Sequence, residues 1–164
     1  MDTAGIRTRI EELYAHGAPP SVAVPIGLQA HLLGHFARDY VAAASILEQE
    51  GPQHYLPALQ LTGHAVELAL KACLASREVP VPHGHDLLDL YDRVEGNGFR
   101  LDEAQYAAVV HLQHFYFRDL VAQTKFKSRY PAMSTERLGG AVPSNAMFGS
   151  VVASLLQQSA EPGA

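Results

Sequence analysis

The fold is decided by residues 55–77, which read YLPALQLTGHAVELALKACLASR. Large apolar residues recur in this stretch at spacings of four and seven: Leu59, Val66, Leu70 and Leu74. Such spacing places them on one face of an α-helix. Further apolar residues widen that face: Leu61, Ala65, Leu68 and Ala72. A face this broad predicts a central helix that contacts several neighbours. At ~1.5 Å per residue it would be about 34 Å long.

The segments on either side of the central helix predict further helices. Residues 27–49 carry an apolar stripe at spacings of three and four: Leu28, Leu32, Phe36, Tyr40, Ala43 and Leu47. Gly51-Pro52 ends that helix, and the prolines of Val79-Pro80-Val81-Pro82 stop the central one. After these prolines, Asp86 is a candidate N-cap for a helix that closes at Gly96-Asn97-Gly98.

The rest of the chain predicts further helices, joined by irregular segments. Asp102 predicts the N-cap of a fifth helix that runs to about Gln123, and Ser144 or Asn145 caps a last helix over residues 145–157. Residues 125–143 read as irregular, residues 4–15 as a short helix and residues 17–25 as a turn or loop. We therefore expect an all-α, antiparallel up-and-down bundle of four to five main helices plus short terminal helices. It would be one domain over residues 1–164, with its core at about 26–131.

Composition limits the classes of function. Hydrophobic residues make up 48 % of the 164 residues and charged residues 18 %, a globular balance. No apolar run reaches the roughly 18–20 residues needed to cross a bilayer, and the N-terminus lacks the apolar region of a signal peptide. Cys73, the single cysteine, cannot form an internal disulfide. We expect a cytoplasmic protein with no membrane partner. Its net charge of −5 means that binding nucleic acid would require a local basic patch.

One group of polar residues is centred on the central helix. Glu67 and Lys71 are four residues apart and share a helical face, and His64 lies three residues before Glu67 on the same face. His85 follows the proline-rich turn that folds the chain back. Acid, amine and imidazole can therefore meet near the end of the bundle. Two readings fit: a polar network that locks the turn to the helix, or a pocket for phosphate or a nucleotide.

A second group is cationic. Its basic residues are Arg118, Lys125, Lys127 and Arg129. Phe126 and Tyr130 alternate with these charges, and aromatic rings between cations can stack bases while the cations hold phosphates. The other reading is a solvated helix end, where cations favour the negative end of the helix dipole.

Together these motifs resemble the HEPN family (higher eukaryotes and prokaryotes nucleotide-binding domain). The resemblance rests on Glu67-x-x-x-Lys71, the proline-rich turn, Gly84-His85-Asp86-Leu87 and Arg129-Tyr130-Pro131, with Arg38–Ala44 upstream. It covers roughly residues 30–131. It implies a helical bundle that usually forms a homodimer, and it implies RNA or nucleotide as ligand. Many HEPN proteins are metal-independent ribonucleases of bacterial toxin–antitoxin, defence or RNA-processing systems, with an active site formed across the dimer. Others bind without cutting or partner a nucleotidyltransferase.

The chain departs from the catalytic motif that the resemblance implies, in which a histidine follows an arginine after four to six residues. No histidine follows Arg118 or Arg129 at that spacing. Two formal matches, Arg9 with His16 and Arg77 with His83, lie where the family does not place its site. Our first hypothesis is therefore a non-catalytic module that binds RNA or a nucleotide.

In this first hypothesis the ligand-binding residues are Glu67, Lys71, His85, Arg118, Lys125, Lys127, Arg129 and Tyr130. The second hypothesis is a diverged metal-independent endoribonuclease that recruits His85 or His83 with Arg129. The third is a structural or immunity subunit that acts through a partner protein.

The nine histidines also raise the question of a metal site. They include the pairs His31/His35, His83/His85 and His111/His114. Helical bundles that bind two iron ions use Glu-x-x-His, which this chain lacks. The chain also has no P-loop, Gly-x-Gly-x-x-Gly or nucleophile elbow. We therefore expect no metal and no cofactor.

Overall fold

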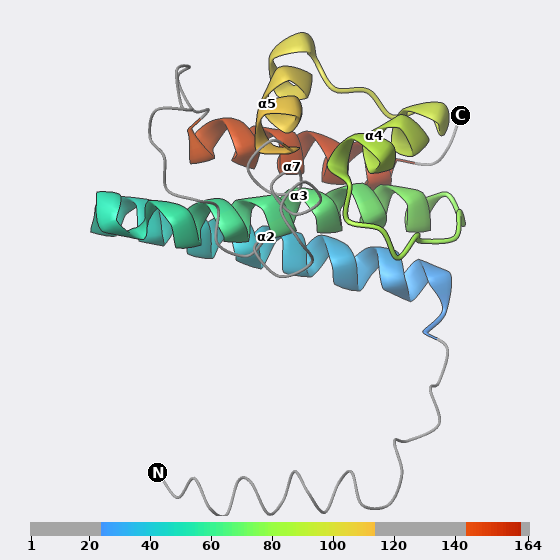
Figure 1. Ribbon diagram of the computed structural model, residues 1–164. Coiled ribbons are helices and arrows are strands. Elements are labelled where there is room, and N and C mark those ends of the chain that lie inside the picture. Colours follow the sequence, from blue (N-terminus) through green and yellow to red (C-terminus); the bar gives the residue numbers. More distant parts are fainter. Residues whose placement is uncertain (1–23, 114–143, 162–164) are drawn as a thin grey trace, which may run out of the picture.

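The computed structural model describes residues 24–113 and 144–161, and its helices follow the predicted order (Figure 1). They are α2 (Ile26–Glu50), the 3₁₀ helix η1 (Pro52–His54), α3 (Tyr55–Ser76), α4 (Leu87–Gly96), α5 (Glu103–Gln113) and α7 (Asn145–Ala160). These residues form no strand, so the all-α prediction is confirmed. None of these helices is long and apolar enough to cross a membrane. The predicted helix at 4–15, the fifth helix beyond Gln113 and residues 125–143 lie outside the described residues.

Helix α3 is the centre of the bundle, as its broad apolar face predicted. It lies between α2 and α7, and it also contacts α4 (Figure 1). Helix α2 runs antiparallel to it, because only Gly51 and η1 separate the two. Helix α7 runs parallel to α3: Thr62 Oγ1 donates to Asn145 Oδ1 at 2.9 Å, and Cys73 Sγ to the Leu155 carbonyl at 3.3 Å.

The apolar stripe of residues 27–49 is not the buried face of α2. Leu28, Leu32 and Phe36 are exposed, and the buried residues are Gly34, Ala37 and Ala44. A Cβ atom at Gly34 would lie 3.2 Å from Leu156 Cδ2, so α2 approaches α7 closely there. Small residues allow this approach, whereas Leu28, Leu32 and Phe36 of the predicted stripe face outward.

The predicted caps begin three of the helices. Asp86 accepts hydrogen bonds from the backbone N–H groups of Leu88 and Asp89, both at 3.0 Å. Asp102 accepts from Gln105 N at 2.8 Å, and the Gln105 side chain accepts from Asp102 N at 3.2 Å, a reciprocal pair. Ser144 caps α7. These caps fix where α4, α5 and α7 enter the bundle.

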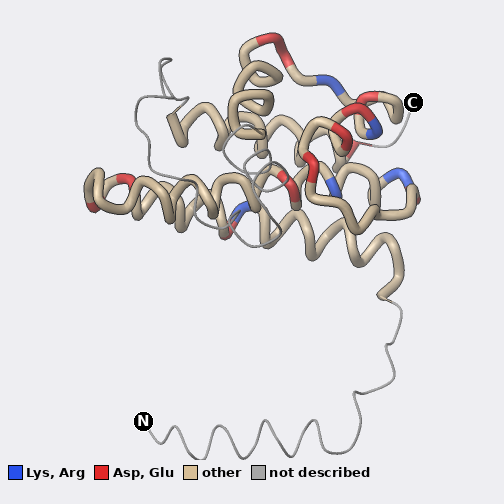
Figure 2. The backbone as a smooth tube through the Cα atoms, viewed as in Figure 1, with Lys and Arg blue, Asp and Glu red and all other residues tan. Residues whose placement is uncertain are grey.

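Charge is unevenly distributed over the described residues. They hold five lysines and arginines but twelve aspartates and glutamates. Many of the acids lie on α4 and at the start of α5 (Figure 2). Four of the predicted cationic site residues lie outside the described residues: Arg118, Lys125, Lys127 and Arg129. A phosphate that approaches the described bundle therefore meets few positive side chains, and one of the five, Lys71, is buried.

Candidate functional site

A buried carboxylate on α3 organises the polar residues of the bundle. The side chain of Glu67 is only 2 % exposed. Lys71, one helical turn later, is also buried, and its Nζ donates a hydrogen bond to Glu67 Oε1 at 2.7 Å. Removing two charges from water is costly unless they neutralise each other. The spacing of four residues allows this, because it places both side chains on one helical face.

The turn between α3 and α4, residues 77–86, carries His85 back to this carboxylate. The backbone N–H groups of Glu78 and Val79 donate to carbonyls in the last turn of α3, and Glu78 adopts a left-handed φ of 59°. The chain therefore reverses as soon as α3 ends. His85 Nδ1 comes to lie 2.9 Å from Glu67 Oε1, the oxygen that also accepts from Lys71.

Both ends of this turn are held by other parts of the bundle. Arg77 donates to the Glu161 carbonyl at 3.0 Å, and its guanidinium lies 4.9 Å from the centre of the Phe99 ring. At the other end, Leu87 N donates to Gln113 Oε1 at 2.8 Å. Gln113 was not among the predicted site residues, because nothing in the sequence distinguishes it from glutamines exposed to solvent.

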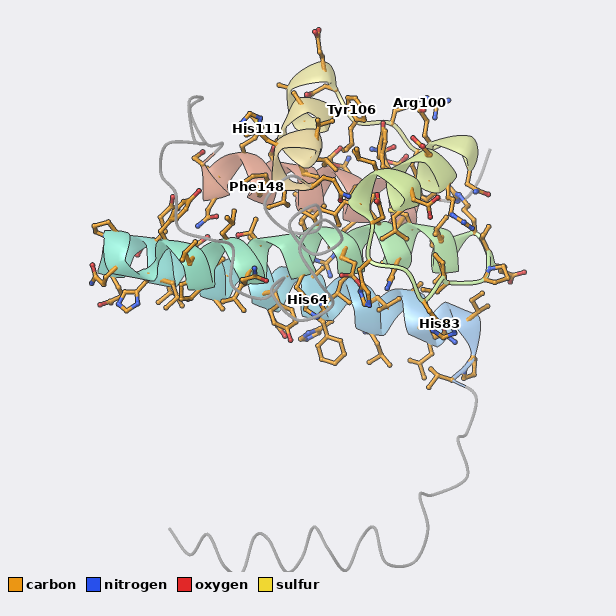
Figure 3. The ribbon with its side chains drawn as sticks, in the orientation of Figure 1. His64, His83, Arg100, Tyr106, His111 and Phe148 are labelled. Atoms are coloured by element: carbon orange, nitrogen blue, oxygen red, sulfur yellow. The ribbon has the colours of Figure 1, made fainter. Side chains whose placement is uncertain are left out.

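A second imidazole faces the same carboxylate. His64 Nδ1 is 3.9 Å from Glu67 Oε2, longer than a hydrogen bond but close enough for a charge contact. The His64 ring meets the Tyr40 ring edge to face, with centroids 4.7 Å apart, between α3 and α2 (Figure 3). The side chain of His64 is 39 % exposed and that of His85 is 62 % exposed. Both imidazoles therefore reach solvent, whereas the carboxylate does not.

Glu67 stays ionised at neutral pH. Burial alone would raise the pKa of its carboxyl. The neighbouring His64, the hydrogen bonds from Lys71 and His85 and the positive charge of Lys71 outweigh this effect and lower the pKa to about 2. An ionised carboxylate can only accept hydrogen bonds, so His85 Nδ1 must carry the proton in their contact. The other ring nitrogen, Nε2, is then free to accept a proton when the ring is neutral, or to donate to a phosphate oxygen when it is charged.

The structure brings together some of the predicted site residues. Glu67, Lys71 and His85 converge as their spacing predicted, and His64 joins them. His83, in the same turn, lies well apart from His64 (Figure 3). The predicted cationic residues and Tyr130 lie outside the described residues: Arg118, Lys125, Lys127 and Arg129. The role of all these residues in binding a ligand stays a prediction.

The histidine pairs do not assemble into a metal site within the described residues. No group of three or more His, Cys, Asp or Glu side chains in 24–113 and 144–161 could hold a metal ion. His35 Nδ1 instead lies 2.9 Å from Asp39 Oδ2 on the exposed side of α2. His114, the partner of His111 in the sequence, lies outside the described residues.

A family model described as HEPN domain matches residues 32–147. The match covers most of the chain and includes α2 from Leu32, all of α3, α4 and α5, and the start of α7. No curated protein and no solved structure matches the chain. The match includes Glu67 and its partners His64, Lys71 and His85.

Proposed function

Because this chain belongs to the HEPN domain family, we propose that it binds RNA or a nucleotide at the cluster of Glu67, Lys71, His64 and His85, called here the Glu67 cluster. We also propose that it does not use the family's arginine–histidine ribonuclease motif. At the family level, HEPN domains are modules related to nucleotides and RNA. One observation carries the finer proposal. The buried Glu67 carboxylate anchors His85 through Nδ1, and the side chain of His85 is nevertheless 62 % exposed.

The charges of the cluster suit a phosphate group. Glu67 and Lys71 neutralise each other, so the carboxylate does not repel an anion as an unpaired one would. His64 and His85 then supply positive charge and N–H donors when they are protonated. The segment from Arg118 to Arg129, with Tyr130, would add cations and a ring for stacking, since its composition is typical of contacts with single-stranded RNA.

Titration with nucleotides and short RNAs tests this proposal. We expect binding at low salt that requires the phosphate group and weakens as salt rises, because bound cations are released from RNA phosphates. The substitution His85→Ala should weaken binding at least several-fold. His54→Ala is the control, because His54 lies in η1, at the opposite end of α3 from the turn that carries His85. The proposal is lost if neither nucleotides nor RNAs bind at low salt.

An endoribonuclease is the alternative that the geometry of His85 favours. A carboxylate that holds one nitrogen of an imidazole and leaves the other open orients that ring as a general base. His85 Nε2 would take the proton of a ribose 2′-hydroxyl, and Arg129 would stabilise charge on the phosphate, leaving a cyclic phosphate product. Incubation of RNA with pure protein in EDTA, across about pH 6–8 where histidine titrates, decides between the two functions. Intact RNA under all these conditions excludes the enzyme.

A second copy of the chain is the partner that family membership favours. HEPN domains often act as dimers, and we infer that this chain forms a homodimer. Light scattering coupled to size-exclusion chromatography measures the mass directly. A mass of one 17.8 kDa chain at micromolar concentration would contradict the inference.

A further inference from the structure

The rim of the Glu67 cluster carries an exposed aromatic ring that the site described so far does not use. Phe36 on α2 is 50 % exposed, the second most exposed of the large apolar side chains in the described residues. It lies one helical turn before Tyr40, whose ring meets His64. Residues four apart on a helix differ by only about 40° in direction. Phe36 therefore points to nearly the same side of α2 as Tyr40. The candidate site would then extend from His64 on α3 to Phe36 on α2.

The exposed leucines of α2 on the N-terminal side of Phe36 lie progressively further from this side. Each step of four residues towards the N-terminus adds about 40° of rotation. Leu32 flanks Phe36, whereas Leu28 turns away towards the face of α2 opposite the core. Only the end of the stripe with Phe36 therefore adjoins His64.

We propose that Phe36 is a stacking platform for an unpaired base of the RNA or nucleotide whose phosphate contacts His64 and His85. This inference rests on the proposed function and narrows its ligand class. Every base presents an apolar face that stacks on an aromatic ring, whatever its sequence. In a duplex these faces are covered by neighbouring bases, so the platform selects single strands and free nucleotides. One helical turn, about 5.4 Å, separates Phe36 from the ring beside the imidazoles, which one nucleotide can span.

The surroundings of Phe36 favour a base over a second protein chain. The His35 ring lies 6.3 Å from the Phe36 ring, and His35 pairs with Asp39 at 2.9 Å. Both side chains of that pair are 63 % exposed. A helix packed across Phe36 would remove the Asp39 carboxylate and its imidazole partner from water, which is costly. A planar base covers the ring and leaves the pair solvated.

Two oligonucleotides separate base stacking from phosphate binding: a fluorescent single-stranded hexaribonucleotide, and a hexamer with the same phosphates and sugars but no bases. Their affinities are measured by fluorescence anisotropy at low salt. The wild type should bind the hexamer with bases about five- to a hundredfold more tightly. Phe36→Ala should remove this preference, and Phe36→Tyr, which keeps the ring, should retain it. Ile46→Ala is the matched control, because Ile46 is an exposed apolar residue in the other half of α2.

Each outcome has a separate meaning. If Phe36→Ala keeps the preference, or if the wild type binds both hexamers equally, the platform is wrong and phosphate binding stands. If neither hexamer binds, the proposed function fails for RNA. A second copy of the chain is the other possible occupant of the Phe36 surface, and measuring the mass of the same proteins in solution tests for it. A change from dimer to monomer in Phe36→Ala would show that a second copy covers the ring, and it would overturn the platform.

Discussion

His85 lies 18 residues after Glu67 in the sequence, and its Nδ1 atom is 2.9 Å from the Oε1 atom of that buried carboxylate. The largely exposed ring of His85 is thus fixed to the buried carboxylate of Glu67. The contact can hold the turn to α3, and it can orient the ring towards a ligand. These two roles differ in what they contribute to stability, and substitutions can separate them.

Replacing His85 tests the orienting role. His85→Ala removes one hydrogen bond to a charged group from an exposed side chain, so the free energy of unfolding should fall by about 1 kcal/mol or less. The affinity for a phosphate ligand should fall much more, by at least several-fold. Urea unfolding and ligand titration on the same protein measure the two effects. A large loss of stability with unchanged affinity would show that His85 only holds the turn.

Replacing Glu67 tests the charge at the centre of the cluster. The folded state lowers the pKa of this carboxyl from 4.5 to about 2. The resulting stabilisation is complete above about pH 4.5 and is lost as the pH falls towards 2, and it amounts to about 3 kcal/mol. Glu67→Gln should therefore be less stable than the wild type at pH 7. The difference should shrink steadily between pH 5 and pH 2.

Urea unfolding followed by circular dichroism at several pH values measures this difference. Asp39→Asn is a suitable control, because Asp39 is exposed and its pair with His35 should contribute little. Parallel stability curves for the wild type and Glu67→Gln across the acid range would contradict a strongly lowered pKa.

The pair of Glu67 and Lys71 should show strong coupling. Lys71→Met leaves the buried carboxylate without its ammonium and should cost about 3 kcal/mol of unfolding free energy. Glu67→Leu leaves the ammonium without its carboxylate and should be similarly costly. The double variant buries two apolar side chains of similar size and should be much more stable than the sum of the single changes implies. Additive effects, within about 0.5 kcal/mol, would mean that the two charges are solvated and do not depend on each other.

The sequence predicted the helices and the centre of the site because both depend on local spacing. The period of Leu59, Val66 and Leu70 identified α3, and the spacing of Glu67 and Lys71 placed them on one face. The predicted buried face of α2 was wrong. Apolar periodicity cannot show that the small residues Gly34 and Ala37 let α2 approach its neighbours closely and therefore form its buried face. The prediction also missed Tyr40 against His64 and Gln113 at the start of α4. Those contacts join residues far apart in the chain, and their positions depend on how the helices pack.

The cap of α4 links a local signal to the site. Asp86 accepts two backbone hydrogen bonds and directly follows His85. Asp86→Ala should lower the free energy of unfolding by about 1 kcal/mol, the usual contribution of an N-cap. Asp86→Asn keeps an oxygen acceptor and should lose less. Thermal unfolding measures both changes. Equal stability of all three proteins would show that the cap contributes nothing.

Cys73 offers a probe of how tightly the centre of α3 is closed. Its side chain is fully buried, and its Sγ donates to the Leu155 carbonyl at 3.3 Å. Burial raises the pKa of the Cys73 thiol to about 12, although the charge of Arg77 opposes this slightly. Because the thiolate is the reactive form, a disulfide reagent at pH 8 should not modify the folded protein, whereas the protein unfolded in urea should react at once. The chain has one cysteine, so the signal is unambiguous.

In Glu67→Gln the reaction without urea should accelerate in step with the loss of stability, because modification of Cys73 requires α3 to separate from α7. Immediate stoichiometric modification of the wild type without urea would show that this packing is open in solution.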